Sequence, residues 1–323
     1  MVRTVLGDIA PAGLGRTDYH EHLFQDTPLL PGDELDDEQR SGAEAGLLRN
    51  SGIAAMVDAT PTGLGRDPAA LARISADRGL HIVATTGAHR EAHYGSGHWL
   101  LDLTEQQLTE RFTSDVEAGM PEADTPDHST VALATNAEPV RAGVLKAGIG
   151  YWGISRFEQR VLAAVAQAHA RTGAPVMVHL EHGSATFELL HLLATYGVRP
   201  DAVVLAHIDR NPDPVLHAEL ADAGAYLGYD GFARTRTWPD SALLDCFVRA
   251  AELGAAGRLL LGGDVARRTR YAAYGGMPGL AYLGERIVPR LVRSGNDKLA
   301  EIALVTNPAR LLGRIDTADT PVG

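Results

Sequence analysis

The chain has 323 residues, of which 45% are hydrophobic and 22% charged, a composition typical of globular enzymes. Its 41 acidic and 29 basic residues give a formal net charge of -12, which disfavours nucleic acid or an anionic membrane surface as partners. The single cysteine, Cys246, excludes an internal disulfide and predicts a reducing, cytoplasmic compartment, and neither a secretory signal nor a run of about eighteen apolar residues is recognisable.

The first elements in chain order are a short hairpin, predicted over residues 1–16, and a strand at residues 17–23 (TDYHEHL). That strand starts a series of eight apolar, β-branched segments, each ending in a polar residue, and we predict a buried strand for each. The other seven segments are residues 53–60, 81–90, 142–150, 175–183, 202–210, 225–231 and 258–267.

Helical stretches with recognisable ends separate these strands. Asp67 and Pro68 open a helix that stops before Gly79, and Ser155 with Glu158 forms a capping box at the start of another. Strands that are apolar throughout and alternate with helices are typical of a parallel sheet with both faces covered. Eight such units predict an α/β fold of the (β/α)8 TIM barrel type.

The chain is longer than the roughly 250 residues that such a barrel needs, so some segments must lie outside it. Residues 113–140 are polar, contain proline and show no periodicity, and we predict that they form an inserted loop between the third and fourth strands. Residues 277–323 are expected to end with a helix at TNPARLLG. No linker is evident, so we expect residues 1–323 to form a single domain.

The last residues of several strands form a candidate site. His20 and His22 are two residues apart, so they lie on one face of their strand, a pattern that fits either a metal site or packed, hydrogen-bonded side chains. In a barrel, however, the carboxyl ends of all strands meet on one face. The residues expected there are His20, His22, Lys146, His179, His207 and Asp264.

Histidine and aspartate are ordinary ligands of zinc and similar ions, and five such donors exceed the three that one catalytic zinc usually takes, which indicates two metals. Lys146 does not fit this pattern as an ammonium, because it would repel cations. It either balances charge or, once carbamylated by carbon dioxide, becomes a carboxylate that bridges two ions.

These residues resemble those of the phosphotriesterase family of the amidohydrolase superfamily. The resemblance runs nearly end to end, through YHEHL, GVLKAG, PVMVHLEHG, AHIDRNPD, GGDVARR and TNPAR. It implies a binuclear-metal-dependent hydrolase in which His20, His22 and Asp264 hold one divalent ion and His179 and His207 hold the other. Carboxylated Lys146 and a hydroxide would bridge the ions, which we expect to be zinc, with manganese or cobalt tolerated.

The expected chemistry is attack by the bridging hydroxide, with Asp264 accepting its proton and Lys146 completing the catalytic centre. Phosphotriesterases proper have a histidine after the aspartate that ends the seventh strand, whereas this chain has Gly231 after Asp230. The resemblance therefore favours the branch that hydrolyses phosphorylated sugar lactones, which carries basic residues after strands 7 and 8.

This chain has five arginines in those positions: Arg234, Arg236, Arg267, Arg268 and Arg270. Guanidinium groups match phosphate and carboxylate geometry, although some of the five are expected to pair with surface acids. By resemblance, Arg236 and Arg267 align best with phosphate-contacting positions, and Arg234 is a further candidate. His89 and Tyr94 are expected to line the leaving-group side, unless the aromatic ring only packs.

The leading hypothesis is thus a lactonase whose small substrate is anionic. The alternatives are a phosphotriester or N-acyl amide hydrolase with the same metals, and a non-catalytic barrel that binds an anion. A homodimer is expected from family habit and from the frequency of twofold symmetry.

Overall fold

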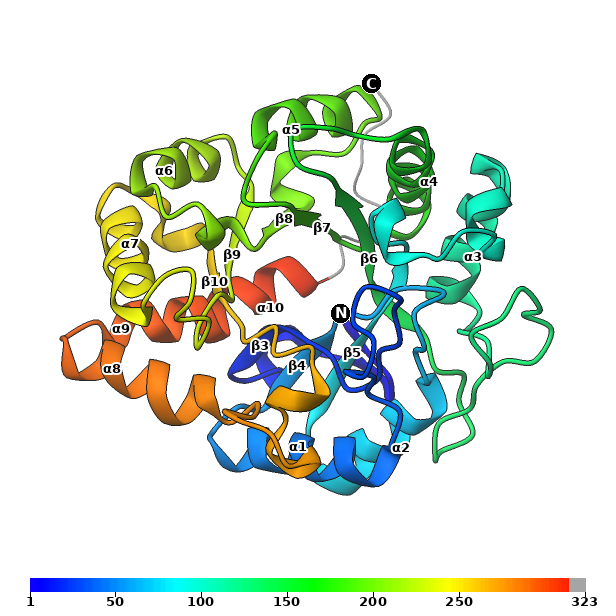
Figure 1. The fold of residues 1–323 in the computed structure, drawn as a ribbon, viewed down its shortest axis with the longest axis horizontal. Helices are drawn as coiled ribbons and strands as arrows, with labels where there is room; N and C mark the ends of the chain where they lie inside the picture. The colour runs from blue at the N-terminus through cyan, green and yellow to red at the C-terminus, as the bar shows by residue number, and fades with distance from the viewer. Residues whose placement is uncertain (314–323) are drawn as a thin grey trace.

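The computed structural model describes residues 1–313 and confirms the (β/α)8 barrel. Figure 1 looks into it, with the strands in the centre and the helices around them. One parallel eight-stranded sheet has the order β10-β9-β8-β7-β6-β5-β4-β3, so strands that follow one another in the chain are neighbours. The strands are β3 (Thr17–Glu21), β4 (Ala55–Asp58), β5 (His81–Gly87), β6 (Ala142–Ile149), β7 (Val176–Leu180), β8 (Val203–Ala206), β9 (Tyr226–Tyr229) and β10 (Leu259–Leu261).

The helices cover the outside of the sheet, and their ends follow the capping residues. Asp67 accepts a hydrogen bond from Ala70 N at the start of α2, and Ser155 and Glu158 form the predicted capping box of α4. The helices are α1 (Glu38–Asn50), α2 (Pro68–Arg78), α3 (Glu105–Glu117), α4 (Arg156–Thr172), α5 (Thr186–Thr195), α6 (Pro214–Asp222), α7 (Asp240–Glu252), α8 (Val288–Arg293), α9 (Asp297–Glu301) and α10 (Asn307–Leu312). No helix within residues 1–313 is long and apolar enough to cross a membrane.

The amino-terminal end of the barrel is closed by apolar side chains from both ends of the chain. The predicted hairpin consists of β1 (Val2–Thr4) and β2 (Gly7–Ile9), which pair antiparallel. Val2 and Leu14 pack with Leu311 and Leu312 of α10 against the side chains that fill the barrel interior. The helix expected at TNPARLLG is therefore α10, and residues 314–323 of the predicted final segment lie outside the described residues.

The predicted insertion at 113–140 begins too early, because helix α3 continues to Glu117. Leu108, Phe112 and Val116 recur at helical spacing and are buried, and this packing extends the helix into a stretch that is otherwise polar. The following residues, 118–141, contain only isolated bridges, among them Pro121 with Val131. This part agrees with the predicted loop.

Alternation along the strands places polar groups directly above the apolar barrel interior. Val144 of β6 and Met177 of β7 belong to the buried cluster inside the barrel. Lys146 lies two residues after Val144 and His179 two residues after Met177, so both point to the same side of the sheet as the apolar residue before them. The last strand, β10, lies beside β3, where Asp264 N donates to His20 O over 2.9 Å. The sheet is thus nearly closed into a barrel. Its first strand and the segment after its last strand lie side by side, which brings His20 and Asp264 together.

Candidate metal centre and substrate cavity

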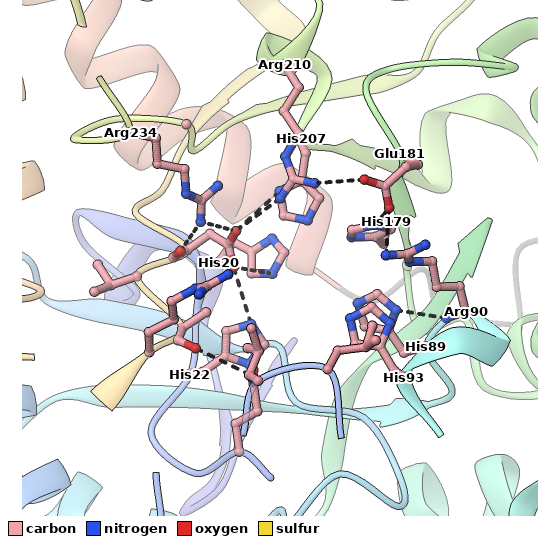
Figure 2. Close-up of a pocket in the computed structure, with 18 of the residues that line it drawn as sticks. His20, His22, His89, Arg90, His93, His179, Glu181, His207, Arg210 and Arg234 are labelled. Carbon is pink, nitrogen blue, oxygen red and sulfur yellow. Dashed lines mark hydrogen bonds and ion pairs between the residues drawn. The ribbon is translucent and has the colours of Figure 1, made fainter. Parts of the chain in front are cut away.

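A cavity of about 490 Å³ lies at the carboxyl ends of the strands, the end at which active sites of this fold occur. Figure 2 shows histidines on its floor and arginines on its walls. The lining includes His20, His22, His89, His93, His179 and His207, together with His182, whose side chain is 61% exposed, and the arginines Arg90, Arg210, Arg234 and Arg267.

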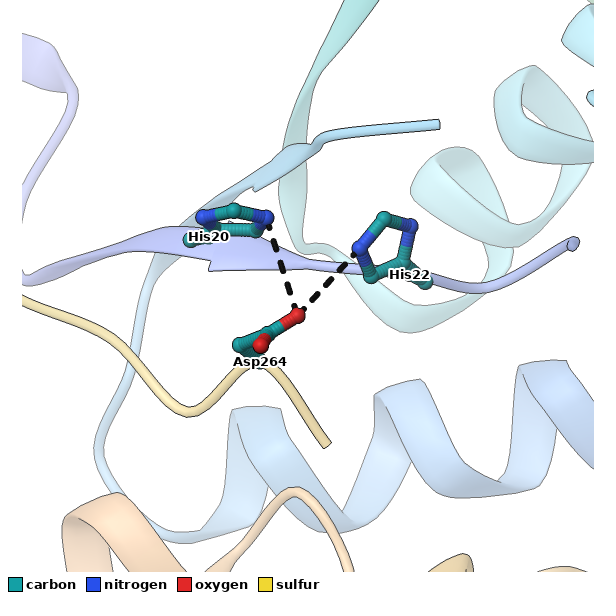
Figure 3. A group of neighbouring side chains, drawn as sticks. All are labelled: His20, His22 and Asp264. Atoms are coloured by element: carbon teal, nitrogen blue, oxygen red, sulfur yellow. Dashed lines mark ion pairs between the residues drawn. The ribbon is translucent and has the colours of Figure 1, made fainter. Parts of the chain in front are cut away.

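His20, His22 and Asp264 form a compact group on this floor (Figure 3). Asp264 Oδ1 lies 3.7 Å from His20 Nε2 and 3.5 Å from His22 Nε2, and all three residues are buried. Ligands that share one zinc at bonds of 2.0 to 2.1 Å in a tetrahedron lie about 3.3 Å apart. The spacing of these three atoms therefore fits a single divalent ion.

Two of the candidate metal ligands, His207 and Asp264, have unusual backbone conformations. His207 and Asp264 have φ values of 62° and 44°, in the left-handed region that few residues other than glycine adopt. Both follow the last residues of their strands, and Ala266 after β10 has the same kind of backbone. Such backbone clusters at functional sites, because the surrounding structure must hold it in place.

The hydrogen bonds of His22 fix which of its nitrogens is available. Its Nδ1 lies 2.7 Å from Thr60 Oγ1, and this hydroxyl donates its only hydrogen to Phe24 O. Thr60 must therefore accept from His22 Nδ1–H, so Nε2 is left with a lone pair.

Asp230 faces two other histidines. Its Oδ1 lies 2.7 Å from His207 Nδ1, its Oδ2 lies 3.3 Å from His20 Nδ1, and Tyr19 donates its hydroxyl to Oδ2. The carboxylate can only accept, so His207 carries its proton on Nδ1 and leaves Nε2 available, whereas His20 Nδ1 faces Oδ2 at 3.3 Å without an aligned hydrogen bond.

His179 is arranged the other way round. Its Nε2 lies 3.5 Å from Glu181 Oε2, whereas its buried Nδ1 has no hydrogen-bond partner in the described part of the chain. In the described part of the chain, His20 Nδ1 and His179 Nδ1 are buried without a hydrogen-bond partner, and the Nε2 atoms of His20 and His22 face only Lys146 and Asp264, which is unusual for buried polar atoms.

The ionisation of the cluster also suits a cation. Burial lowers the pKa of His20 to about 3, and it lowers the pKa values of His179 and His207, so the imidazoles are neutral. Burial alone would raise the pKa of Asp264, but the charge of Arg234 lowers it well below its ordinary value, so this group is ionised. Neutral imidazoles with an ionised carboxylate are the ligand types that divalent zinc prefers. The residues present therefore fit a divalent metal.

Lys146 lies within the same cluster. Its side chain is buried, and its Nζ lies 3.2 Å from His20 Nε2 and 3.3 Å from Met177 Sδ. Burial lowers the pKa of this amine to about 8, and Asp264 and Asp230 offset part of the shift.

The arginines on the cavity wall connect the cluster to a second acid, Glu181. Arg234 donates to Asp264, and Arg210 lies 3.6 Å from Asp264 Oδ2 and 4.0 Å from Glu181 Oε1. Arg90 pairs with Glu181 over 2.9 Å. Three guanidiniums around two carboxylates make this wall cationic in a chain whose net charge is -12.

Not every predicted contact residue reaches the cavity. Arg236 is exposed and is not part of the lining, although Arg234, Thr237 and Trp238 of the same loop are. Tyr94 is buried in the packing around the cavity, where its hydroxyl donates to Thr62 O and accepts from His89 N. Arg234, Arg267 and His89 do line the cavity.

The remaining arginines of that group have other surroundings. Arg267 is half exposed and lies 3.5 Å from Asp33, Arg268 lies 3.9 Å from Asp36, and Arg270 is directed at Val265 O. Pairing with acids, expected for some of these arginines, thus occurs at two surface positions.

His93 and Asp230 are among the residues of the site that sequence reasoning missed. His93 stacks on His89 with ring centroids 3.4 Å apart, and a histidine four residues after a candidate site histidine was the available signal. Asp230 directly follows β9, so the rule that identified the other strand-end residues also applied to it.

Comparisons with known proteins agree with this geometry. The phosphotriesterase family profile matches residues 1–312. The solved structure of a lactonase from Listeria monocytogenes superposes with a TM-score of 0.85 at 30% identity and covers 98% of this chain and 99% of that one. A phospho-furanose lactonase from Mycoplasmopsis synoviae is 29% identical over 96% of this chain and 91% of its own length. An N-acetyltaurine hydrolase from Homo sapiens is 26% identical over 96% of this chain and 97% of its own length. The chain belongs to the phosphotriesterase family of hydrolases.

Proposed function

We propose that the chain is a binuclear-metal-dependent hydrolase that opens a lactone carrying a phosphate or another anionic group. The observation that carries this proposal is the set of four buried histidines gathered around ionised Asp264 and buried Lys146, with His20, His22 and Asp264 close enough to hold one ion. The arginines around this floor and the relatives named lactonase and phospho-furanose lactonase support the choice of bond.

In this proposal His20, His22 and Asp264 hold one ion, and His179 and His207 hold the second. We propose zinc as the metal, with manganese or cobalt tolerated, since the donors are imidazole nitrogens and carboxylate oxygens. When bound, such ions lower the pKa of water towards neutrality and polarise the bond to be broken. Asp264, kept ionised by Arg234, is the proposed acceptor of the proton of the attacking water.

Lys146 is proposed to become carboxylated and to bridge the two ions. Its pKa of about 8 leaves a fraction of neutral amine at neutral pH, which is the form that reacts with carbon dioxide. Carbon-13-labelled bicarbonate tests this directly. A carbamate resonance is expected in the wild-type protein and not in Lys146→Met, and its absence from both would contradict the bridge.

The arginine wall supplies the proposed specificity for an anion. Arg234, Arg267 and Arg210 line the cavity, and planar guanidiniums bind phosphate or carboxylate through paired hydrogen bonds. His89, on the side of the cavity opposite Arg234 in Figure 2, is proposed to contact the leaving group. Arg236, on its exposed loop, is the weakest member of the proposed set.

Turnover of a substrate panel tests the function. Zinc-reconstituted protein is expected to hydrolyse phosphorylated lactones at least about tenfold faster than uncharged lactones, the effect of roughly one charged hydrogen bond. A chelator should abolish the activity, and added zinc should restore it. Hydrolysis of uncharged lactones alone would contradict the anionic substrate, and no metal-dependent hydrolysis of any lactone would contradict the function.

A second candidate keeps the site and changes the bond to an N-acyl amide, because one full-length relative is named N-acetyltaurine hydrolase. The cationic wall does not distinguish the two, so N-acyl amides with anionic groups belong in the same panel. A phosphotriester belongs there as well, although Gly231 weakens this alternative. Fewer than one ion per chain after reconstitution would favour an anion-binding barrel without catalysis.

We also propose a cytoplasmic homodimer, on the basis of the single cysteine and the frequency of twofold symmetry. Light scattering after size-exclusion chromatography measures the oligomeric state.

A further inference from the structure

Asp230 lies between two of the proposed ligands and is fully buried at the end of β9. We propose that Asp230 is a positioning residue that orients one histidine of each metal site, so that the affinities for the two ions depend on the same carboxylate. This inference rests on the proposed binuclear function.

The distances identify Asp230 as a hydrogen-bond partner. By distance alone, a metal ion could also be held by Asp230 together with His20 and His207. However, Asp230 Oδ1 and His207 Nδ1 are 2.7 Å apart, which is a hydrogen-bond length and shorter than the roughly 3.3 Å between two ligands of one tetrahedral ion. Tyr19 also donates to Oδ2, so this oxygen is already engaged.

The two oxygens of this carboxylate serve two different histidines. Oδ1 accepts from His207 and Oδ2 faces His20, and these two residues belong to different proposed metal sites. The hydrogen bond keeps the proton of His207 on Nδ1, and the negative Oδ2 at 3.3 Å favours a proton on His20 Nδ1 by charge, so that His20 Nε2 faces the cluster; this is the usual way in which a carboxylate prepares a histidine ligand. The position of the carboxylate itself is fixed by Asp209 Oδ2, which accepts from the backbone amides of Asp230 and Gly231.

His22 provides an internal control, because a separate group orients it. Thr60 accepts from His22 Nδ1 and contacts neither His20 nor His207 through its hydroxyl in the described structure. Loss of the Thr60 hydroxyl should therefore weaken one ion, whereas loss of the Asp230 carboxylate should weaken both.

Asparagine at position 230 gives an intermediate case. Its amide has one acceptor oxygen, and an NH₂ group takes the place of the other carboxylate oxygen. The Tyr19 hydroxyl can accept from this NH₂ group, so the amide nitrogen is expected at the Oδ2 position and the oxygen facing His207. His20 would then have to move its proton to Nε2, the atom proposed to bind the metal.

The experiment measures binding of cobalt(II) to the metal-free full-length chain, by its absorption spectrum and by competition with a chelator. Wild type is expected to bind two ions. Thr60→Val should weaken one ion by about 10 to 100-fold, Asp230→Asn should weaken one, and Asp230→Ala should weaken both by about this factor. Circular dichroism of each metal-free variant identifies variants that fail to fold, and Asp230→Asn, in which the side chain keeps nearly the same shape, then tests the contact with His20 separately.

Two results would overturn the inference. If wild type binds two ions and Asp230→Ala and Asp230→Asn bind both as tightly, the positioning role is wrong while the proposed function stands. If wild type itself binds fewer than two ions, the binuclear function fails and the inference fails with it.

Discussion

Buried histidines occur in two places around this barrel, and they differ in how their nitrogens are used. His217 on α6 is fully buried, with Nδ1 at the Tyr229 hydroxyl and Nε2 3.0 Å from Asn211 O, so both nitrogens have partners. His20, His22, His179 and His207 are just as buried, but each keeps one nitrogen that no surrounding residue outside the cluster engages. Burial does not distinguish a ligand from a structural histidine, whereas the number of engaged nitrogens does.

The largest expected effect is the loss of one ligand histidine. His179→Gln should lower kcat/KM by about 10³-fold or more, because an ion contributes several kcal/mol of charge stabilisation in the transition state. The matched variant His217→Gln removes a histidine of equal burial and should leave the number of bound ions unchanged. Metal analysis and steady-state kinetics check both variants. Equal metal loss in the two variants would show that the number of engaged nitrogens does not distinguish a ligand histidine from a structural one.

The next effect concerns stability in acid. Burial lowers the pKa of His217 to about 4, below its ordinary 6.5, so the unfolded state binds this proton more readily. His217 therefore costs stability as pH falls from 6.5 to 4, by up to about 3 kcal/mol. His217→Gln lacks this term, so the difference in urea midpoint between wild type and variant should shrink over that range. A constant difference would show that His217 is not buried as a neutral group.

A smaller effect is expected from Arg234, whose charge lies beside the histidine cluster and Asp264. Arg234→Met should lower kcat/KM for an anionic lactone by about 10 to 100-fold and for an uncharged analogue much less, since the loss of a charged hydrogen bond costs about 1.5 to 3 kcal/mol. Arg268→Met, in the loop after β10 but beside Asp36, is the control and should change neither rate. Equal losses on both substrates would assign Arg234 to holding Asp264 rather than to substrate recognition.

The smallest effect is expected around His217, where the side chain of Cys246 is packed. Cys246 Sγ lies 3.4 Å from the Tyr229 hydroxyl and 3.6 Å from His217 Nδ1, and burial raises the pKa of this thiol to about 11. Cys246→Ala should cost about 1 kcal/mol and leave activity unchanged. A thiol reagent should label Cys246 only in denaturant, and rapid labelling of the native protein would contradict the packing.

Much of the site followed from the strand pattern, because period-two alternation and the shared carboxyl end of a barrel locate residues such as Lys146 and His179 without further information. Loop residues could not be placed in this way. Tyr94 and Arg236 lie beyond strand ends, where no period fixes the direction of a side chain.

The partners of the histidines were also out of reach of the sequence. Thr60 lies 38 residues from His22, and nothing in either segment indicates that they meet. The insertion was predicted five residues too long, at 113–117, because the polar character of the segment hid the apolar stripe that extends α3.

The left-handed backbone at His207 and Asp264 limits how this centre can evolve. Histidine, aspartate and asparagine are among the few residues other than glycine that tolerate such φ values, whereas a β-branched or bulky side chain there would strain the backbone. Selection for a different metal could therefore exchange these two proposed ligands only within a very small set of amino acids. New substrate preferences are open to the chain mainly through the loops that carry the arginines, so metal chemistry and specificity can diverge at different rates.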